Sequence, residues 1–503
     1  MRLGSFDSGE RSGLQPTLTG IVLALGLFGA VVAGYGVANG NLILGAVPVA
    51  LACVLLLSIY PTLILWLTLA VGLVAAGLAK LYFPALAEIR WLVIPLGALL
   101  VLHVLIGFFA SNWERAGRST MPPILGWGGA VVAVALLATL VNTPEPLQLA
   151  RGLKGYFQMW GVLLALALLV WPNQLMRRQL PRALLVVALL QLPFVLHQYL
   201  VLVPQRAVLE VKGLVPFDVI AGTFGAQQLG GGANAMLAIF MFVVLAGLTG
   251  LWQTKVLSGK WLVLLGVLLL APMFVNGAKV SLVFALTLFL VMFGKDVVAR
   301  PGRFAMIASV VTVTLVAMLF VYSVGIDNRR VENWSGVVAD IYQRNVEADQ
   351  ENRGTFTRGG ALRYWGEQHI PADPFGALLG HGLYESRHSD GGVDLWDVSD
   401  PSLGIKNTAV SAILWDTGLL GLATVFGLII SAYLTAGRLA HYYRYDPWMA
   451  GLFLGVKAAM VIIFVSLWAK SYFGYHIAYQ TMLVVLLGWL AYWDRQSRGS
   501  RIE

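Results

Sequence analysis

The chain has 503 residues, of which 58% are hydrophobic and only 12% are charged, whereas soluble domains carry roughly 25% charged residues. This composition excludes an ordinary soluble enzyme. The net charge of +9 does not indicate a nucleic-acid partner, because most Lys and Arg residues lie in short segments between apolar runs, as in membrane proteins. The single cysteine, Cys53, excludes a disulfide framework.

Apolar runs of ~20 residues recur along nearly the whole chain, and each is long enough to cross a ~30 Å hydrocarbon core. A backbone in lipid must satisfy its polar groups internally, so these runs should be helices. We therefore predict an all-α polytopic membrane protein with about fourteen transmembrane helices. Their expected starts are near Thr17, Asn41, Thr62, Arg90, Met121, Leu149, Ala183, Ala233, Trp261, Val280, Phe304, Thr408, Met449 and Gly474.

Basic residues occupy alternate loops, for example Arg177 with Arg178 and Arg438 with Arg444. The positive-inside rule then predicts a multi-pass protein with both termini in the cytoplasm. Three regions follow from this topology. Residues 1–324 form helices 1–11 with a short Gly-rich periplasmic segment at 204–232, residues 325–407 form a large periplasmic loop, and residues 408–503 form the last three helices and a cytoplasmic tail.

Ionisable residues at membrane depth are costly and usually functional, although long side chains also snorkel to lipid headgroups. Lys279 follows a polar break at Asn276, Lys406 stands where the large loop re-enters the membrane, and Arg151 stands at the outer start of a span. The large loop adds further arginines, whose planar groups bind phosphate oxygens in pairs. We expect a cationic pocket for a membrane-held ligand that carries phosphate.

Motifs of soluble enzymes are missing from the sequence. We find no Walker A loop, no HExxH and no His/Cys cluster with zinc-ligand spacing. Acidic residues in the large loop do not follow EF-hand spacing. We therefore expect no cofactor and no required metal.

Four groups of short motifs occur in order between residues 120 and 435. They are Gly222-Thr223-Phe224-Gly225 with Gly232-Ala233-Asn234; Asn276-Gly277-Ala278-Lys279; Arg358 to Trp365 with Pro374-Phe375-Gly376 and Gly380-His381-Gly382; and Lys406-Asn407-Thr408 with Gly418-Leu419-Leu420-Gly421. Together they resemble the superfamily of O-antigen ligases and O-antigen polymerases (Wzy-type). The ligases typically carry His where this chain has Lys406, which favours a polymerase.

The resemblance implies a GT-C-like membrane glycosyltransferase of the bacterial inner (cytoplasmic) membrane. Its substrate would be an oligosaccharide linked to undecaprenyl pyrophosphate, polymerised at the periplasmic face into an exopolysaccharide, a capsule or an O-antigen. Chain-length regulators and export proteins would be its partners. Two alternatives stay open: a ligase that transfers glycan to lipid A or another acceptor, and a transporter of lipid-linked sugar or another anion. Transport is less favoured, because no internal repeat is evident.

In such a transfer the lipid pyrophosphate leaves as negative charge develops on it, and fixed cations stabilise that charge without a metal. Direct displacement inverts the anomeric configuration. Expected pyrophosphate ligands are Lys279, Arg151, Arg363 and Lys406. Expected catalytic groups are Arg358, Arg363 and Lys406, with His381, His388 or Glu385 as the general base for the acceptor hydroxyl.

Overall fold

A computed structural model describes residues 60–110, 121–209, 215–276, 278–299, 357–387 and 407–499, with a few isolated positions between 301 and 313. The chain divides into two compact units, Met1–Leu67 and Thr68–Glu503. Of the first unit only the beginning of helix α3 is described. All contacts discussed below belong to the second unit.

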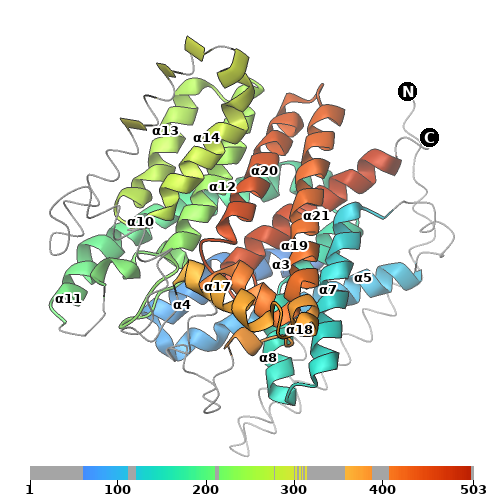
Figure 1. The fold of residues 1–503 in the computed structure, drawn as a ribbon. Helices are drawn as coiled ribbons and strands as arrows, with labels where there is room; N and C mark the ends of the chain where they lie inside the picture. The colour runs from blue at the N-terminus through green and yellow to red at the C-terminus, as the bar shows by residue number, and fades with distance from the viewer. Residues whose placement is uncertain are drawn as a thin grey trace, which may run out of the picture. The chain divides into compact units, whose positions relative to one another are not determined.

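The described residues are almost entirely helical (Figure 1). The first half contains α3 (Pro61–Ala70), the π-helical segment η1 (Val71–Ala75), α4 (Ala76–Tyr82), η2 (Pro84–Leu92), α5 (Val93–Ala110), α7 (Pro123–Asn142), α8 (Pro146–Phe157), α9 (Trp160–Leu168), η3 (Leu175–Gln179), α10 (Leu180–His197), η4 (Gln198–Leu202), α11 (Val203–Ala207), η5 (Pro216–Val219) and η6 (Gly222–Phe224). The second half contains α12 (Asn234–Gln253), α13 (Gly259–Leu270), η7 (Ala271–Phe274), α14 (Val280–Ala299), α17 (Arg358–His369), α18 (Pro374–Leu379), η8 (Glu385–Arg387), α19 (Ala409–Tyr442), α20 (Pro447–Ser466) and α21 (Ile477–Gly499).

Within the described residues, seven helical stretches are long and apolar enough to cross a membrane: Pro61–Tyr82, Pro84–Phe109, Pro123–Asn142, Leu175–Ala207, Asn234–Gln253, Ala409–Tyr442 and Pro447–Ser466. Two shorter apolar helices, Gly259–Phe274 and Val280–Lys295, follow α12. The protein is therefore a helical, multi-pass membrane protein. The total of fourteen spans and the periplasmic loop stay predictions, since the spans expected near Thr17 and Asn41 lie outside the described residues, as does most of the one expected near Phe304.

One expected span differs from a simple membrane helix. The apolar run that begins near Leu149 is divided at Gln158 and Met159 into α8, of 12 residues, and α9, of 9 residues. Each helix is shorter than the roughly 17 residues that a crossing requires. The backbone at this break approaches α21, because the Gln480 amide donates to the carbonyl of Gly155.

The core of the second unit is formed by α12, which packs along α20, while α19 packs against α20 and α7 and α21 packs against α9. Glycines permit the closest approach. A Cβ on Gly250 would lie 2.1 Å from the carbonyl oxygen of Gly451, and one on Gly455 would lie 2.5 Å from the Cα of Gly247. Small residues at such crossings let membrane helices gain dispersion energy through direct backbone contact.

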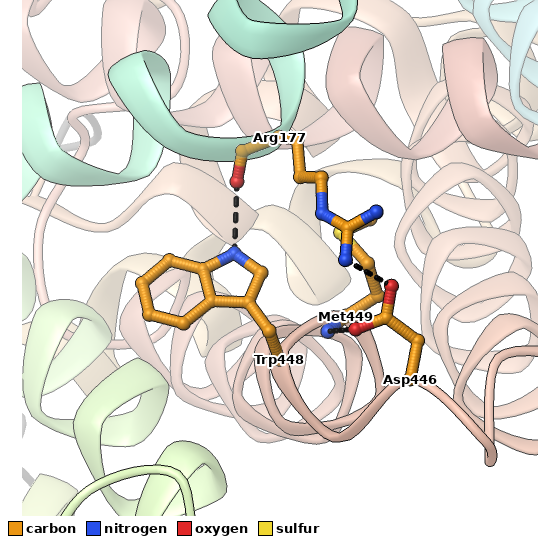
Figure 2. Close-up of polar contacts among 4 residues, drawn as sticks. All are labelled: Arg177, Asp446, Trp448 and Met449. Atoms are coloured by element: carbon orange, nitrogen blue, oxygen red, sulfur yellow. Dashed lines mark hydrogen bonds and ion pairs between the residues drawn. The ribbon is translucent and has the colours of Figure 1, made fainter.

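At one end of the unit, basic residues form ion pairs and hydrogen bonds that connect several helix ends. Arg177 forms an ion pair with Asp446, the N-cap of α20, and the Trp448 indole N–H donates to the Arg177 carbonyl at 2.9 Å (Figure 2). Arg438 pairs with the buried Asp494 of α21. The segment that carries Arg177 therefore lies at the same end of the unit as the connection between α19 and α20. Helices α17 and α18 contact the opposite, N-terminal end of α19.

Candidate functional site

Two buried glutamines fix the conformation of the Gly222-Thr223 motif. The side-chain oxygen of Gln198 accepts hydrogen bonds from the backbone N–H of Ala221 and Gly222, and its amide donates to the Gly222 carbonyl. Gln191 accepts from the Thr223 N–H at 2.7 Å, and its amide donates to the Thr223 hydroxyl. Gly222 has φ of +59°, a conformation that favours glycine. The hydrogen bonds from the two glutamines and the positive φ of Gly222 therefore account for the residues of this motif.

The same segment lies directly on η1 and helix α4. The Thr223 hydroxyl donates to the Leu73 carbonyl at 2.8 Å, and a Cβ on Gly77 would lie 2.0 Å from the Thr223 carbonyl oxygen. Gly225, with φ of +97°, faces Gly77 across this contact. Because the two backbones touch, Lys80, one turn beyond Gly77, lies beside the Gly-rich segment.

A cavity of about 370 Å³ opens next to this contact. Its size falls within the range of small-ligand sites. Helix α4, η2, the Gly-rich segment and the loop before α21 form its walls. The lining residues used below are Lys80, Arg90, Gly225, Tyr472, Tyr475 and His476.

The α4 side of the cavity carries positive charge. Lys80 and Arg90 line it, and the Nε of Arg90 is buried without a hydrogen-bond partner among the described residues. Lys154 of α8 lies next to Arg90, with its ammonium 3.0 Å from the centroid of the Trp91 ring. Burial, reinforced by Arg90, lowers the pKa of Lys154 to about 8. Lys154 is thus mostly charged at neutral pH and loses its charge when the pH rises above about 8.

The opposite wall is formed by the loop between α20 and α21. Arg358, the first residue of α17, lies close to Lys470 and Tyr472, and burial lowers the pKa of this arginine. Partial desolvation and the neighbouring Arg358 also lower the pKa of Lys470. Burial and the nearby Lys80 lower the pKa of His476 to about 3, so this imidazole is neutral at pH 7. Asp218 is the acidic group that interacts with Lys470 here.

A buried carboxylate, Asp416 of α19, connects this loop to α8 and η8 and was missed by the sequence reasoning. It is fully buried and accepts hydrogen bonds from the Tyr156 hydroxyl at 2.8 Å and from the Ser386 N–H at 2.7 Å. The Tyr475 hydroxyl lies 3.5 Å from it, and Arg387 stacks 3.9 Å above the Tyr475 ring. An acid within the apolar run of α19 was the available signal, because ionisable residues in spans are usually functional.

The Gly380-His381-Gly382 motif pairs with the backbone of α19. The N–H groups of His381 and Gly382 donate to the carbonyls of Trp415 and Asp416, both at 2.9 Å. A Cβ on Gly380 would lie 2.5 Å from the nitrogen of Thr417, and Gly380 has φ of +71°. This contact explains why glycine occupies these positions.

The candidate general bases have defined partners. The Nε2 atoms of His381 and His369 lie 2.7 Å apart, and burial together with His369 lowers the pKa of His381. Glu385 accepts a hydrogen bond of 2.7 Å from the Gln148 amide of α8. His388 lies outside the described residues.

The expected phosphate ligands are distributed unevenly. Arg358 joins the cationic wall, whereas Arg363 pairs with Glu367 on an exposed turn of α17, with 72% of its side chain accessible. The guanidinium of Arg151 lies 5.8 Å from the Tyr384 ring, and one of its terminal nitrogens is buried without a partner in the described part of the chain. Lys279 is half-buried beside the start of α14, and Lys406 lies outside the described residues.

Sequence reasoning missed Lys80, Arg90 and Lys470, which flank the cavity. Each stands near the end of an apolar run, where a basic residue is ordinarily assigned to the membrane interface. Comparison with known proteins adds no family: no family model matches the chain, and no curated protein matches it.

Proposed function

We propose that the protein is a membrane glycosyltransferase that polymerises oligosaccharide repeat units carried on undecaprenyl pyrophosphate. The observation that carries the proposal is the cavity lined by Lys80 and Arg90, with Lys154, Arg358 and Lys470 close to its walls. Cations gathered around one cavity, at the border of apolar helices, suit a ligand with a charged head and a lipid tail. From the motif resemblance given above we take the substrate class and expect the reaction at the periplasmic face of the inner membrane.

The proposed reaction is a direct displacement at the anomeric carbon. The acceptor hydroxyl oxygen forms a bond to that carbon as the bond to the pyrophosphate oxygen breaks, and the electron pair leaves with the lipid pyrophosphate. Lys80, Arg90 and Arg358 stabilise the negative charge that develops on this leaving group. The hydroxyl proton passes to a carboxylate or imidazole, and we assign it to Glu385, since His381 is engaged with His369.

Buried donors without partners support an anionic ligand. The Nε of Arg90 and a terminal nitrogen of Arg151 have no hydrogen-bond acceptor among the described residues. Leaving such a donor unpaired costs about 1–3 kcal/mol, and a phosphate oxygen would remove that cost. A transporter is less well supported, because no internal repeat is evident in the sequence.

The test is turnover of a lipid-pyrophosphate-linked oligosaccharide by the full chain in lipid nanodiscs. We expect a ladder of longer lipid-linked glycans from the wild type. Lys80→Gln and Arg90→Gln should each lower its rate on the order of 100-fold, the typical cost of removing one charged donor. Lys457→Gln is the matched control, since Lys457 lies on α20 against the Tyr433 ring, away from the cavity.

Other outcomes would contradict the proposal in different ways. Transfer of a single glycan to a lipid acceptor, without a ladder, would identify a ligase. Uptake of the lipid-linked sugar into sealed vesicles without new glycosidic bonds would identify a transporter. A rate in Lys457→Gln as low as in Lys80→Gln would mean that the cavity is not the site.

A further inference from the structure

A second cluster lies apart from the cationic cavity, where α17, α18 and the N-terminal part of α19 meet. His369 at the end of α17, Asp373 before α18 and His381 after it each offer one ligand atom, and the three atoms lie within 4.8 Å of one another. The proposed function does not use His369 or Asp373. Only His381 of the three was named from the sequence as a candidate base, and the spacing His-x3-Asp-x7-His went unnoticed because it is not a His/Cys pattern.

A hydrogen bond to the Trp365 carbonyl fixes the tautomer of His369 and leaves its lone pair on Nε2. Its Nδ1 lies 2.7 Å from the Trp365 carbonyl oxygen, which can only accept, so Nδ1 carries the proton. The Nε2 atom therefore presents a lone pair, and it points at the Nε2 of His381, 2.7 Å away. A ring N–H donated to a backbone carbonyl is the usual second hydrogen bond of a metal-binding histidine.

The other two groups are also held in place. The Asp373 carboxylate accepts from the Gly376 N–H at 2.9 Å and so caps α18. The backbone of His381 is fixed by its hydrogen bond to the Trp415 carbonyl. The Trp365 and Trp415 rings stand 5.1 and 5.2 Å from the His369 ring and cover it, leaving this histidine 2% exposed. His381 and Asp373 are half-buried, which leaves one side open to water.

We propose that His369, Asp373 and His381 bind a divalent transition-metal ion, with Zn²⁺ the best match to two imidazoles and one carboxylate. Mg²⁺ and Ca²⁺ fit poorly, since they prefer oxygen ligands. A tetrahedral zinc ion with Zn–N bonds near 2.0 Å separates its nitrogen ligands by about 3.3 Å, so the two imidazoles move apart by about 0.6 Å on binding. His381 binds as the Nδ1–H tautomer, and water completes the coordination.

The ion would fix α17 and α18 on the start of α19, and its role is structural. The proposal does not depend on the glycosyltransferase function, and its test does not use turnover. The competing arrangement is a simple hydrogen bond, in which His381 Nε2–H donates to the His369 lone pair without any metal.

The experiment measures metal content and metal-dependent stability in the full chain, purified in detergent through an affinity tag that contains no histidine. After equilibration with Zn²⁺ and removal of the excess, we expect about one zinc per chain by mass spectrometry. His369→Ala and His381→Ala should retain less than about a tenth of that zinc, and His441→Ala on the far end of α19 should retain all of it. Zn²⁺ should raise the Tm of the wild type and of His441→Ala only.

Asp373→Asn keeps the test decisive if a histidine variant fails to fold, because the amide oxygen can still cap α18. We expect zinc affinity to fall at least about tenfold in this variant. A Co²⁺-loaded wild type should show visible absorption of tetrahedral cobalt. Wild-type protein without bound zinc, zinc retained equally by His369→Ala, or preferential binding of Mg²⁺ would each overturn the proposal.

Discussion

Raising the pH should discharge one specific cation near the cavity and weaken anion binding there. The pKa of Lys154 is lowered to about 8, first by burial and then by Arg90. A group with this pKa is about 90% charged at pH 7 and about 10% charged at pH 9. If the charged form of Lys154 is needed to bind the pyrophosphate, affinity should fall about ninefold between these values. The pyrophosphate between lipid and sugar keeps both charges throughout the range.

The assay is equilibrium binding of a polyprenyl-pyrophosphate-linked oligosaccharide to the protein in nanodiscs, between pH 7 and pH 9. Lys154→Arg should bind with a flat pH profile, because arginine stays charged. Lys154→Gln should bind weakly at every pH. Unfolding would not produce the same loss of binding at high pH. The pKa of Lys154 is lower in the folded state than its ordinary value of 10.5, so the unfolded state binds more protons above about pH 8. The folded state therefore becomes relatively more stable as the pH rises from about 8. A flat wild-type profile, or an unchanged decline in Lys154→Gln, would refute the assignment.

Three further predictions concern packing and the buried carboxylates. Gly77→Ala should lower stability by about 1–3 kcal/mol in thermal unfolding, since its Cβ would lie 2.0 Å from a carbonyl oxygen, whereas Gly129→Ala meets nothing within 4 Å and should be neutral. Asp494→Ala should lower the free energy of unfolding by about 3 kcal/mol, because Arg438 and Arg498 lose their buried partner and regain water only in part. Glu88→Gln removes only the exposed ion pair with Arg90 and should change the free energy of unfolding by less than about 0.5 kcal/mol. Asp416→Asn should lower both turnover and Tm, because an amide nitrogen cannot accept a hydrogen bond and so leaves at least one of the donors Tyr156, Tyr475 and Ser386 N–H without its acceptor; unchanged turnover would remove Asp416 from the site.

Hydropathy predicted the helices well wherever a single apolar run forms one helix. The expected starts near Thr62, Ala233 and Met449 lie within two residues of the starts of α3, α12 and α20. This works because in lipid the length of an apolar run and the need for internal hydrogen bonds decide the structure locally. The run after Leu149 did not follow this rule. Its break at Gln158 lies beside a contact with α21, where the Gln480 amide donates to the Gly155 carbonyl, and no local sequence pattern indicates this contact.

The candidate site was predicted only in part, for a related reason. The sequence indicated a cationic pocket and named Arg358, which lies beside Lys470 and Tyr472. It did not indicate Lys80 or Arg90, because their role depends on the contact between Gly77 and Gly225, about 150 residues apart in the chain. Arg363 stands five residues after Arg358 on the same helix, about 140° around the helix axis, and it pairs with Glu367 at the surface. Helical direction, rather than motif spacing, separates these two arginines.

The glycines of the motifs and the cations of the cavity carry different kinds of information. Gly222, Gly380 and Gly418 have positive φ and touch backbone or buried side chains, so any chain with this backbone would need glycine there, whatever its activity. Their agreement with a motif pattern therefore reports on backbone conformation and carries no information about the reaction. The reaction has to be argued from Lys80 and Arg90, which line the cavity, and from Arg358, which lies beside its wall. Variants of these cations, with Lys457→Gln beside them, decide the function, whereas variants of the glycines would report only on folding.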